Sequence, residues 1–289
     1  MKFAAAVILY NPSEKEIKNI NTYLNSVEEV LIYDNTENGD NTNLLDYLNS
    51  NNYTYIKNQG NEGLCKPLNK ALDHCIEKKY DFLLTMDQDS YFLKENIEKY
   101  LEDIINFSNL ETVGQFGLTY EKVELKYENL GFYESKSYLI TSSSMININQ
   151  INNFNIRFDE NLFIDCLDYD FSFNLILHGL RNILFTDNYF VHNIGEPIKR
   201  ASYKSLFLIK KKKTIHSEIR MYYINRNTMY LQNKYANTKL SKYSENYRNI
   251  MKKYLETCLS YSKNYFKAKS LLKKGANDFK HNIMGKLIQ

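Results

Sequence analysis

The 289-residue chain contains no tryptophan, only three prolines and only ten glycines. So little proline and glycine excludes collagen-like repeats and proline-rich disordered segments. The four cysteines form no CxxC pair, and none lies at zinc-ligand spacing from a histidine. This pattern argues against a disulfide scaffold or a structural zinc site and predicts reduced thiols in a cytosolic protein.

Long apolar runs are also missing, since no segment approaches the 18 residues that a membrane-spanning helix requires. The apolar run at residues 3–10 ends at Asn11-Pro12-Ser13 and meets no small-residue cleavage site. We therefore expect a buried first strand there instead of a secretory signal. Neither GxGxxG nor GxxxxGK[ST] occurs, so the sequence supports neither a dinucleotide-binding fold nor a P-loop.

Charge is distributed unevenly along the chain. Residues 1–198 contain 15 Lys+Arg and 30 Asp+Glu, whereas residues 199–289 contain 22 Lys+Arg and 4 Asp+Glu. A change of sign near Pro197 predicts two parts, a catalytic domain at 1–198 and a basic helical region at 199–289. The basic region, with Lys210 to Lys213, suits a peripheral contact with anionic membrane. The alternatives are a solvated surface and a surface that packs against the acidic first part of the chain. Nucleic-acid binding is not expected, because the remainder is acidic and no reader motif is present.

Strand and helix patterns alternate in the first two-thirds of the chain. Apolar runs predict strands at 4–10, 30–33, 53–56 and 81–86, and helical patterns fall at 13–26, 41–50 and 66–79. Ser13 as N-cap with Glu16 three residues later indicates a capping box. The fold class expected is therefore α/β, with a mostly parallel sheet, helices on both faces and a helical C-terminal region.

Polar residues follow each of these four strands. Because parallel strands end at one edge of the sheet, we expect their loops to meet and to form a ligand site there. The alternative is that these residues are ordinary polar loops, which commonly follow strands and need not bind a ligand. The four clusters are Tyr10-Asn11-Pro12, Asp34-Asn35, Asn61-Glu62-Gly63 and Asp87-Gln88-Asp89-Ser90.

Two groups of carboxylates carry candidate chemistry. Asp87 and Asp89 follow a buried strand and are two residues apart, so both can point to the same side and share a Mg²⁺ or Mn²⁺ ion with substrate phosphates. Asp165, Asp168 and Asp170 precede a helix that we expect to end at His178-Gly179. Acidic residues favour a helix N-terminus in any case, but three exceed what capping needs, and one could serve as a general base.

Two further positions have both a functional and a structural interpretation. His192 follows a predicted strand at 183–185 and could reach a metal held by Asp89, although a lone histidine is more often structural. Arg220 and Arg226, interleaved with Tyr222 and Tyr223, suit a lid over a diphosphate, but are equally ordinary packing on an amphipathic helix.

In their order and spacing these motifs resemble those of bacterial family 2 glycosyltransferases, particularly the rhamnosyltransferase branch, over residues 4–230. Asp-Gln-Asp-Ser at 87–90 is typical of that branch. The other motifs that carry the resemblance are Tyr10-Asn11-Pro12, Tyr33-Asp34-Asn35, Asn61-x-Gly63 with Asn69, Leu162-Phe163-Ile164-Asp165 with Asp168 and Asp170, His192-x-x-Gly195 and Tyr222-Tyr223-x-x-Arg226-Asn227.

The resemblance implies a GT-A fold, a nucleotide-diphosphate sugar donor, a divalent metal (Mn²⁺ or Mg²⁺) and inversion at the anomeric carbon. It assigns the uracil or thymine ring to Asp34, the ribose or sugar to Asp87, and the metal to Asp89 and His192 with help from Asp87. Asp168 matches the catalytic base, with Asp165 and Asp170 as supporting carboxylates. The remaining residues implied on the sugar-donor side are Tyr10, Asn11, Pro12, Asn35, Asn61, Gly63, Asn69 and Arg226.

From this resemblance we expect an enzyme that transfers rhamnose from dTDP-rhamnose to a cell-surface glycan or a lipid-linked oligosaccharide, as in capsule or lipopolysaccharide synthesis. We expect the enzyme in the cytoplasm, either free or bound peripherally to the inner face of the cell membrane. Two alternatives stay open. One is the same fold using UDP-galactose, UDP-glucose or a UDP-N-acetylhexosamine, and the other is a non-catalytic member that binds nucleotide or a partner protein.

Overall fold

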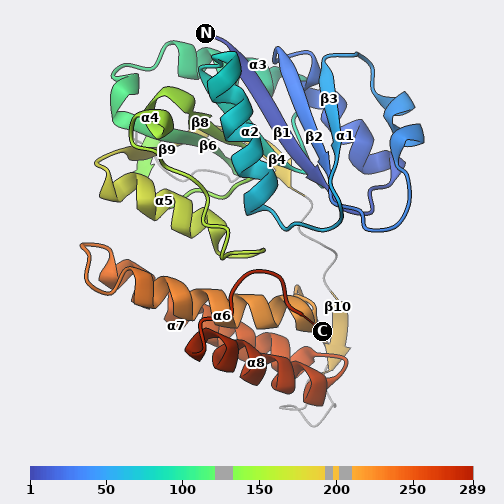
Figure 1. The fold of residues 1–289 in the computed structure, drawn as a ribbon, viewed down its shortest axis with the longest axis vertical. Helices are drawn as coiled ribbons and strands as arrows, with labels where there is room; N and C mark the ends of the chain where they lie inside the picture. The colour runs from blue at the N-terminus through green and yellow to red at the C-terminus, as the bar shows by residue number, and fades with distance from the viewer. Residues whose placement is uncertain (121–132, 193–197, 202–209, 289) are drawn as a thin grey trace. The chain divides into compact units, whose positions relative to one another are not determined.

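The computed structural model describes residues 1–120, 133–192, 198–201 and 210–288, and these form two compact units (Figure 1). The sheet unit comprises Met1–Asp159 and Asp168–Asn193. The helical unit comprises Glu160–Leu167 and Ile194–Gln289. The separation therefore lies close to the change of charge, but the short segment Glu160–Leu167 belongs with the C-terminal helices, which the sequence did not indicate.

A nine-stranded sheet forms the centre of the sheet unit, in the order β3-β2-β1-β4-β8-β6-β9-β5, with β7 also beside β9. The four strands expected from the sequence are mutually parallel, whereas β8 runs antiparallel to both β4 and β6. The strands are β1 (Phe3–Leu9), β2 (Glu29–Asp34), β3 (Tyr53–Lys57), β4 (Phe82–Asp87), β5 (Ser90–Tyr91), β6 (Val113–Tyr120), β7 (Tyr133–Lys136), β8 (Ser144–Asn147) and β9 (Arg181–His192).

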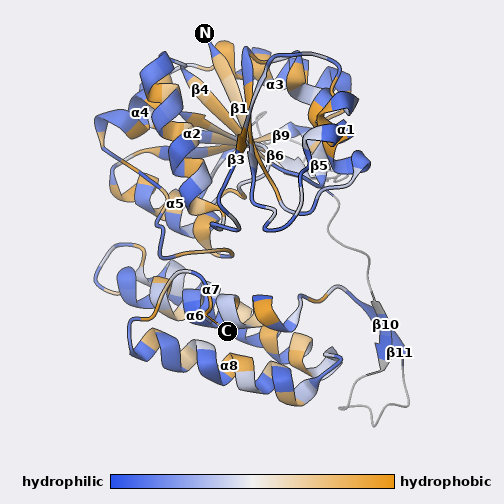
Figure 2. Cartoon of the chain, turned by 45° about the vertical axis from the view of Figure 1, so that its right-hand side comes forward, coloured by the Kyte–Doolittle hydropathy of each residue, from blue (hydrophilic) through white to orange (hydrophobic). Residues whose placement is uncertain are grey.

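Helices cover both faces of this sheet, as the alternating pattern predicted (Figure 2). One face carries α1 (Glu14–Leu24) and α3 (Lys94–Ile105). The other face carries α2 (Cys65–Lys78) and α4 (Ile148–Asn153). The sheet unit is completed by α5 (Leu167–Leu177) and the short 3₁₀ segments η1 (Thr42–Tyr47) and η2 (Leu110–Thr112). The predicted α/β fold class, with helices on both faces of a mostly parallel sheet, is thus confirmed.

Local sequence signals explain two of these helix ends. Ser13 and Glu16 form the predicted capping box at the start of α1. Gly179 has φ +80° just beyond the end of α5, which is the left-handed C′ position that glycine fills without strain. The predicted helix at 41–50 is wrong in type, since only the 3₁₀ segment η1 forms. Asn41 does not cap it, because its side chain bonds Asp34 and Thr36 instead.

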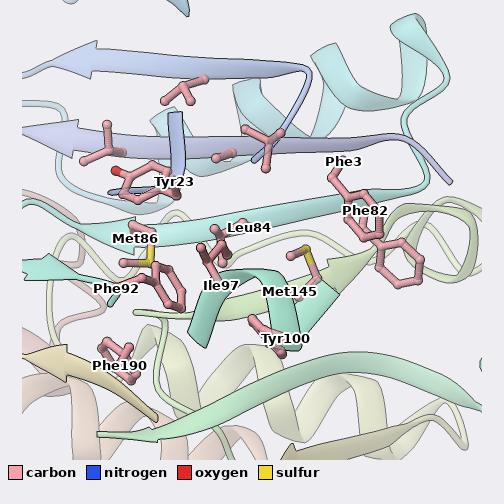
Figure 3. Packing of buried hydrophobic residues seen from close by; sticks show 14 of the residues in the cluster. Phe3, Tyr23, Phe82, Leu84, Met86, Phe92, Ile97, Tyr100, Met145 and Phe190 are labelled. Carbon is pink, nitrogen blue, oxygen red and sulfur yellow. The ribbon is translucent and has the colours of Figure 1, made fainter. Parts of the chain in front are cut away.

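The core of the sheet unit lies between the sheet and helices α1 and α3 (Figure 3). Tyr23 of α1 and Tyr100 of α3 pack against Phe92, whose ring also contacts Phe190 of β9. Burial of this aromatic surface stabilises the folded state by about 25 cal/mol for each Å² of apolar surface removed from water. The parallel pairing of β1 with β2 and with β4 brings the carboxyl ends of these strands together, which is where the polar clusters lie.

The helical unit contains α6 (Glu218–Lys234), α7 (Ser241–Tyr261) and α8 (Tyr265–Lys280), together with a hairpin of β10 (Ile198–Ala201) and β11 (Lys210–Lys213). Its small apolar core joins the three helices through Met221, Ile224, Leu255, Cys258 and Ala268. Gly275 lets α8 approach α6 closely, since a Cβ there would stand 2.7 Å from the Tyr222 carbonyl oxygen. Within the described ranges, no helix combines the length and hydropathy needed to cross a membrane.

Candidate functional site

Hydrogen bonds connect the four polar clusters at the carboxyl ends of the strands. The Tyr10 amide after β1 donates to Gln88 Oε1 after β4 at 2.8 Å, and Gln88 Nε2 returns a bond to the Tyr10 carbonyl. The Asn11 amide donates to Thr36 Oγ1 after β2 at 2.9 Å. The predicted convergence of these loops is therefore observed, with Pro12 leading from the first of them towards α1.

Asn35 joins the second and third clusters. Its backbone amide donates to the Leu9 carbonyl at 2.8 Å, and its side-chain amide donates to the Gly63 carbonyl at 2.7 Å. Asn58 donates to Asn35 Oδ1 at 2.9 Å, so the side chain is bonded at both ends. Asn61 Oδ1 accepts from the Gly63 amide, which stabilises a turn where Gly63 has φ +76°. Asn35, Asn61 and Gly63 thus shape one loop.

Asp34 lies at the end of β2 with no exposed surface. Its Oδ2 accepts from Asn41 Nδ2 at 2.9 Å, Tyr55 Oη at 2.7 Å and Lys57 Nζ at 3.0 Å, and its Oδ1 accepts from the Thr36 amide at 2.8 Å. Burial by itself raises the pKa of Asp34, but these hydrogen bonds outweigh it and lower the pKa to about 2. Asp34 is consequently a fixed carboxylate beneath the β2 and β3 strand ends.

Asp87, Asp89 and His192 form a cluster whose potential ligand atoms all lie within 4.8 Å of one another. Asp87 ends β4, and its backbone amide donates to Ser142 Oγ at 3.2 Å. His192 ends β9, where β5 pairs Ser90 directly with it. The ring is held by Ser90, whose Oγ lies 2.6 Å from His192 Nδ1, and this same nitrogen is 3.7 Å from Asp89 Oδ1.

Two carboxylates and an imidazole suit a divalent cation. Hard Mg²⁺ and Mn²⁺ accept carboxylate oxygen, and imidazole is a common additional ligand for transition metals. All three side chains are partly buried, so a cation held there could also meet a bound substrate. The rest of the predicted motif, Asn193 to Gly195, and Pro197 lie outside the residues that the structure describes.

The second acidic group is divided between the two units. Asp168 and Asp170 lie in the first turn of α5, in the sheet unit. Asp168 is partly buried and accepts at Oδ1 from the Tyr169 amide at 3.0 Å, whereas Asp170 is buried. Asp165 lies in the segment Glu160–Leu167 of the helical unit, where Arg220 binds its carboxylate. Asp165 therefore belongs to a different unit from Asp168 and Asp170, although only two residues lie between Asp165 and Asp168.

Two residues that the family resemblance placed on the sugar-donor side are engaged in packing. Arg226 has no exposed surface, and its guanidinium donates to Tyr222 Oη at 3.1 Å and to the Gly285 carbonyl at 2.9 Å. Asn69 exchanges two hydrogen bonds with the backbone of Phe158, at 2.9 and 3.0 Å. Burial and these partners favour structural roles, because both side chains already have their hydrogen bonds inside the protein.

Sequence reasoning did not single out several residues that shape the site. Tyr55 and Lys57 reach Asp34 from β3, and Thr36 links the loops after β1 and β2. Their signal in the sequence is weak, because each sits at a strand end like any polar residue. Ser90 was recognised within Asp-Gln-Asp-Ser, but its bond to His192 joins residues 102 apart in the chain.

Comparison with known proteins identifies the family of the chain. A model of the family described as glycosyl transferase family 2 matches residues 6–162, which is more than half of the chain. The chain belongs to this family. The dTDP-rhamnosyl transferase RfbF of Shigella flexneri is 27% identical over 249 residues, which cover 80% of this chain and 79% of that protein. The predicted similarity to rhamnosyltransferases of family 2 is thereby confirmed.

Solved structures share the fold at low sequence identity. Residues 1–349 of S. aureus TarS in complex with UDP-GlcNAc match with a TM-score of 0.57 and 18% identity, covering 98% of this chain and 82% of that one. A second crystal structure of TarS 1–349 matches with a TM-score of 0.52 and 19% identity, covering 86% and 69%. At these identities the similarity describes the GT-A-type fold.

Proposed function

We propose that this protein is an inverting glycosyltransferase that moves rhamnose from dTDP-rhamnose to a hydroxyl of a cell-surface glycan or lipid-linked oligosaccharide. One observation carries the proposal: the buried carboxylate of Asp34 and the Asp87–Asp89–His192 cluster follow strands of one sheet, in loops joined by hydrogen bonds. A pyrimidine nucleotide diphosphate has a base and a charged end that suit these two features. The similarity to a dTDP-rhamnosyl transferase supports the choice of sugar donor.

In this proposal Asp34 accepts a hydrogen bond from N3–H of thymine. Three of its present donors, Asn41, Tyr55 and Lys57, converge on Oδ2, so the base must replace one of them or approach Oδ1. The low pKa of Asp34, about 2, keeps it an acceptor at neutral pH. Asp87 contacts the ribose or sugar, and the rest of the sugar-donor side is formed by Tyr10, Asn11, Pro12, Asn35, Asn61 and Gly63.

Asp89 and His192, with Asp87, would hold Mn²⁺ or Mg²⁺. Such a cation stabilises negative charge on the departing diphosphate by several kcal/mol. The protein's own contribution is to bring the two carboxylates and the imidazole together and to fix the ring through Ser90. That preorganisation would orient the diphosphate relative to the acceptor.

Asp168 is proposed as the general base. Its carboxylate takes the proton of the acceptor hydroxyl while the acceptor oxygen forms a bond to the anomeric carbon, and the bond from that carbon to the diphosphate oxygen breaks. Attack from the face opposite to the leaving group inverts the anomeric configuration, through a transition state with oxocarbenium character. Asp170 is a supporting carboxylate in the same turn. Asp165 is proposed as a second supporting carboxylate, whose orientation is set by its ion pair with Arg220.

A panel of nucleotide sugars tests the reaction class and the sugar donor together. Purified protein should release nucleotide diphosphate fastest from dTDP-rhamnose, measured against UDP-galactose, UDP-glucose and UDP-N-acetylglucosamine. If the protein prefers a UDP-hexose, the proposed sugar donor is wrong and the proposed reaction class still holds. Binding of nucleotide without release from any of the four, with or without a glycan acceptor, would favour the non-catalytic alternative.

The helical unit is proposed to bind anionic membrane where a lipid-linked acceptor would be found, on the inner face of the cell membrane. The four lysines of β11, Lys210–Lys213, are all exposed. On α8, Phe266 is 83% exposed next to the exposed Lys267 and Lys269. Lysines attract anionic lipid at about 1 kcal/mol each, and an exposed phenylalanine adds apolar contact at the interface.

A further inference from the structure

A strained turn leads directly into the helix that carries Asp168. Asp165 and Cys166 are consecutive non-glycine residues with φ of +63° and +71°, and α5 begins at the next residue, Leu167. Left-handed backbone is uncommon for residues with a side chain, and two in succession persist only where their surroundings hold them. Such turns cluster at functional sites, where the surrounding structure holds them in place.

Two side chains of α6 hold the turn. Asn227 Nδ2 donates to the Ile164 carbonyl at 2.8 Å and to the Asp165 carbonyl at 3.0 Å. The Arg220 guanidinium binds both carboxylate oxygens of Asp165, with Nε 3.2 Å from Oδ2. Asn227 thus fixes the backbone of the turn, and Arg220 fixes the side chain of Asp165. A two-point Arg–carboxylate contact also restricts orientation.

Asn227 is itself held in place from within the helical unit. Arg226 Nε donates to Asn227 Oδ1 at 3.1 Å, which leaves the amide nitrogen directed at the two carbonyls. Arg226 is anchored by Tyr222 and by the Gly285 carbonyl, and Tyr222 donates to Asp278 of α8 at 2.7 Å. A continuous series of hydrogen bonds therefore runs from α8 through Arg226 to the turn at Asp165.

We propose that Asn227, Arg220 and Arg226 are positioning residues that fix the backbone of the turn at Asp165 and Cys166, and thereby the local geometry of the first turn of α5, which carries Asp168. Only Leu167 separates the strained turn from Asp168, so a change of backbone at Cys166 is passed on through a single residue. This inference rests on the proposed function of Asp168. It also gives the grouping of arginines and tyrosines in α6 a role other than a diphosphate lid.

The test compares two asparagines of α6. Asn227→Ala removes the donor to the turn. Asn225→Ala removes two side-chain bonds made elsewhere, one donated to the Leu272 carbonyl of α8 at 2.8 Å and one accepted from Arg248 at 3.0 Å. Both variants lose stability, but only Asn227→Ala should lower kcat, by about tenfold to 10²-fold, the scale of a small misplacement of a catalytic group. The KM for the nucleotide sugar should stay within about twofold, because the nucleotide loops are not touched.

A second measurement does not depend on turnover. Hydrogen exchange of peptides that cover residues 160–170 should accelerate in Asn227→Ala and in Arg220→Gln, and should be unchanged in Asn225→Ala. Arg220 has a partly exposed side chain, so its variant serves if Asn227→Ala does not fold. Equal kcat and equal exchange in the Asn227 and Asn225 variants would overturn the positioning role.

Asp168→Asn, assayed in the same series, distinguishes failure of the positioning role from failure of the proposed general base. If Asp168→Asn keeps full kcat, the proposed base is wrong, whatever the Asn227 variant does. If Asp168→Asn is inactive while Asn227→Ala behaves like Asn225→Ala, the base stands and the positioning role fails. Loss of kcat in both Asp168→Asn and Asn227→Ala, with faster exchange at 160–170 in the latter, is the result we expect.

Discussion

Ser90 Oγ lies 2.6 Å from Nδ1 of His192, across the antiparallel pair of β5 and β9. The bond fixes the imidazole ring beside Asp89 and gives Ser90 the place of an outer-shell partner in the proposed metal site. Partners of this kind orient a ligand and typically alter metal affinity by about 10- to 100-fold when removed.

Ser90→Ala should therefore weaken Mn²⁺ binding by about 10- to 100-fold, and His192→Ala should weaken it further. Calorimetric titration of the protein with Mn²⁺ measures both, and turnover should vanish in excess chelator and return with Mn²⁺ or Mg²⁺. His178→Ala is the matched control, since that exposed histidine lies just beyond α5, where its Nδ1 is 2.9 Å from the Asn174 carbonyl oxygen. Full activity in excess chelator would remove the metal from the proposal and leave Asp87 and Asp89 as ribose or sugar contacts.

Asp168→Asn should lower sugar transfer by ~10²-fold or more, because the amide retains the shape of the carboxylate but does not accept the hydroxyl proton. The Kd for nucleotide sugar should change little, which equilibrium binding checks alongside the rate. Asp170→Asn and Asp165→Asn are the comparison variants and should cost less transfer. An active Asp168→Asn beside an inactive Asp170→Asn would move the base within the helix, and activity in all three would refute general-base catalysis by this group.

Asp34 should make folding stability sensitive to acid. Its pKa is lowered to about 2, so its stabilising contribution is complete above the ordinary carboxyl range near pH 4 and is lost as the pH falls towards 2. A shift of this size corresponds to about 2 kcal/mol of unfolding free energy. Urea unfolding of the parent and of Asp34→Asn should give curves whose separation narrows below about pH 4. A separation that is constant from pH 7 to 3 would contradict the assigned shift.

Binding to vesicles tests the helical unit. Anionic vesicles should retain the protein at low salt and release it as salt screens the lysines, and neutral vesicles should not retain it. Changing Lys210–Lys213 to Gln, or Phe266 to Ala, should weaken retention. A control of equal charge changes exposed lysines of the sheet unit, namely Lys2, Lys15, Lys78 and Lys94. Equal weakening by the control would reduce the effect to net charge, and the absence of binding to anionic vesicles would end the membrane proposal.

Gly275→Ala should destabilise the helical unit, although alanine ordinarily favours a helix over glycine by about 1 kcal/mol. The new Cβ would stand 2.7 Å from the Tyr222 carbonyl oxygen, a backbone atom of α6 that does not move aside easily. Thermal unfolding should show a lower Tm for Gly275→Ala, and a Tm at or above the parent value for Asn277→Ala at an exposed position of α8. A raised Tm for Gly275→Ala would show that α6 and α8 can move apart without loss of stability.

Short-range sequence patterns were enough to predict much of the fold of the sheet unit. Apolar runs gave the four parallel strands, Ser13 with Glu16 gave the start of α1, and Gly179 gave the end of α5. The polar strand ends were predicted to meet because parallel strands finish at one edge, and the hydrogen bonds between Tyr10 and Gln88 confirm this for two of them.

Only the tertiary structure decided how individual polar side chains are used. The partners of Asn41, Asp165 and Arg226 come from other elements. The 3₁₀ form of η1, the ion pair of Asp165 with Arg220, and the burial of Arg226 therefore had no local signal. A buried polar group takes whichever partner the packing brings near it, because leaving it unpaired costs about 1–3 kcal/mol. Sequence periodicity fixes which face of an element is buried, but the partner across that face is set when the elements pack.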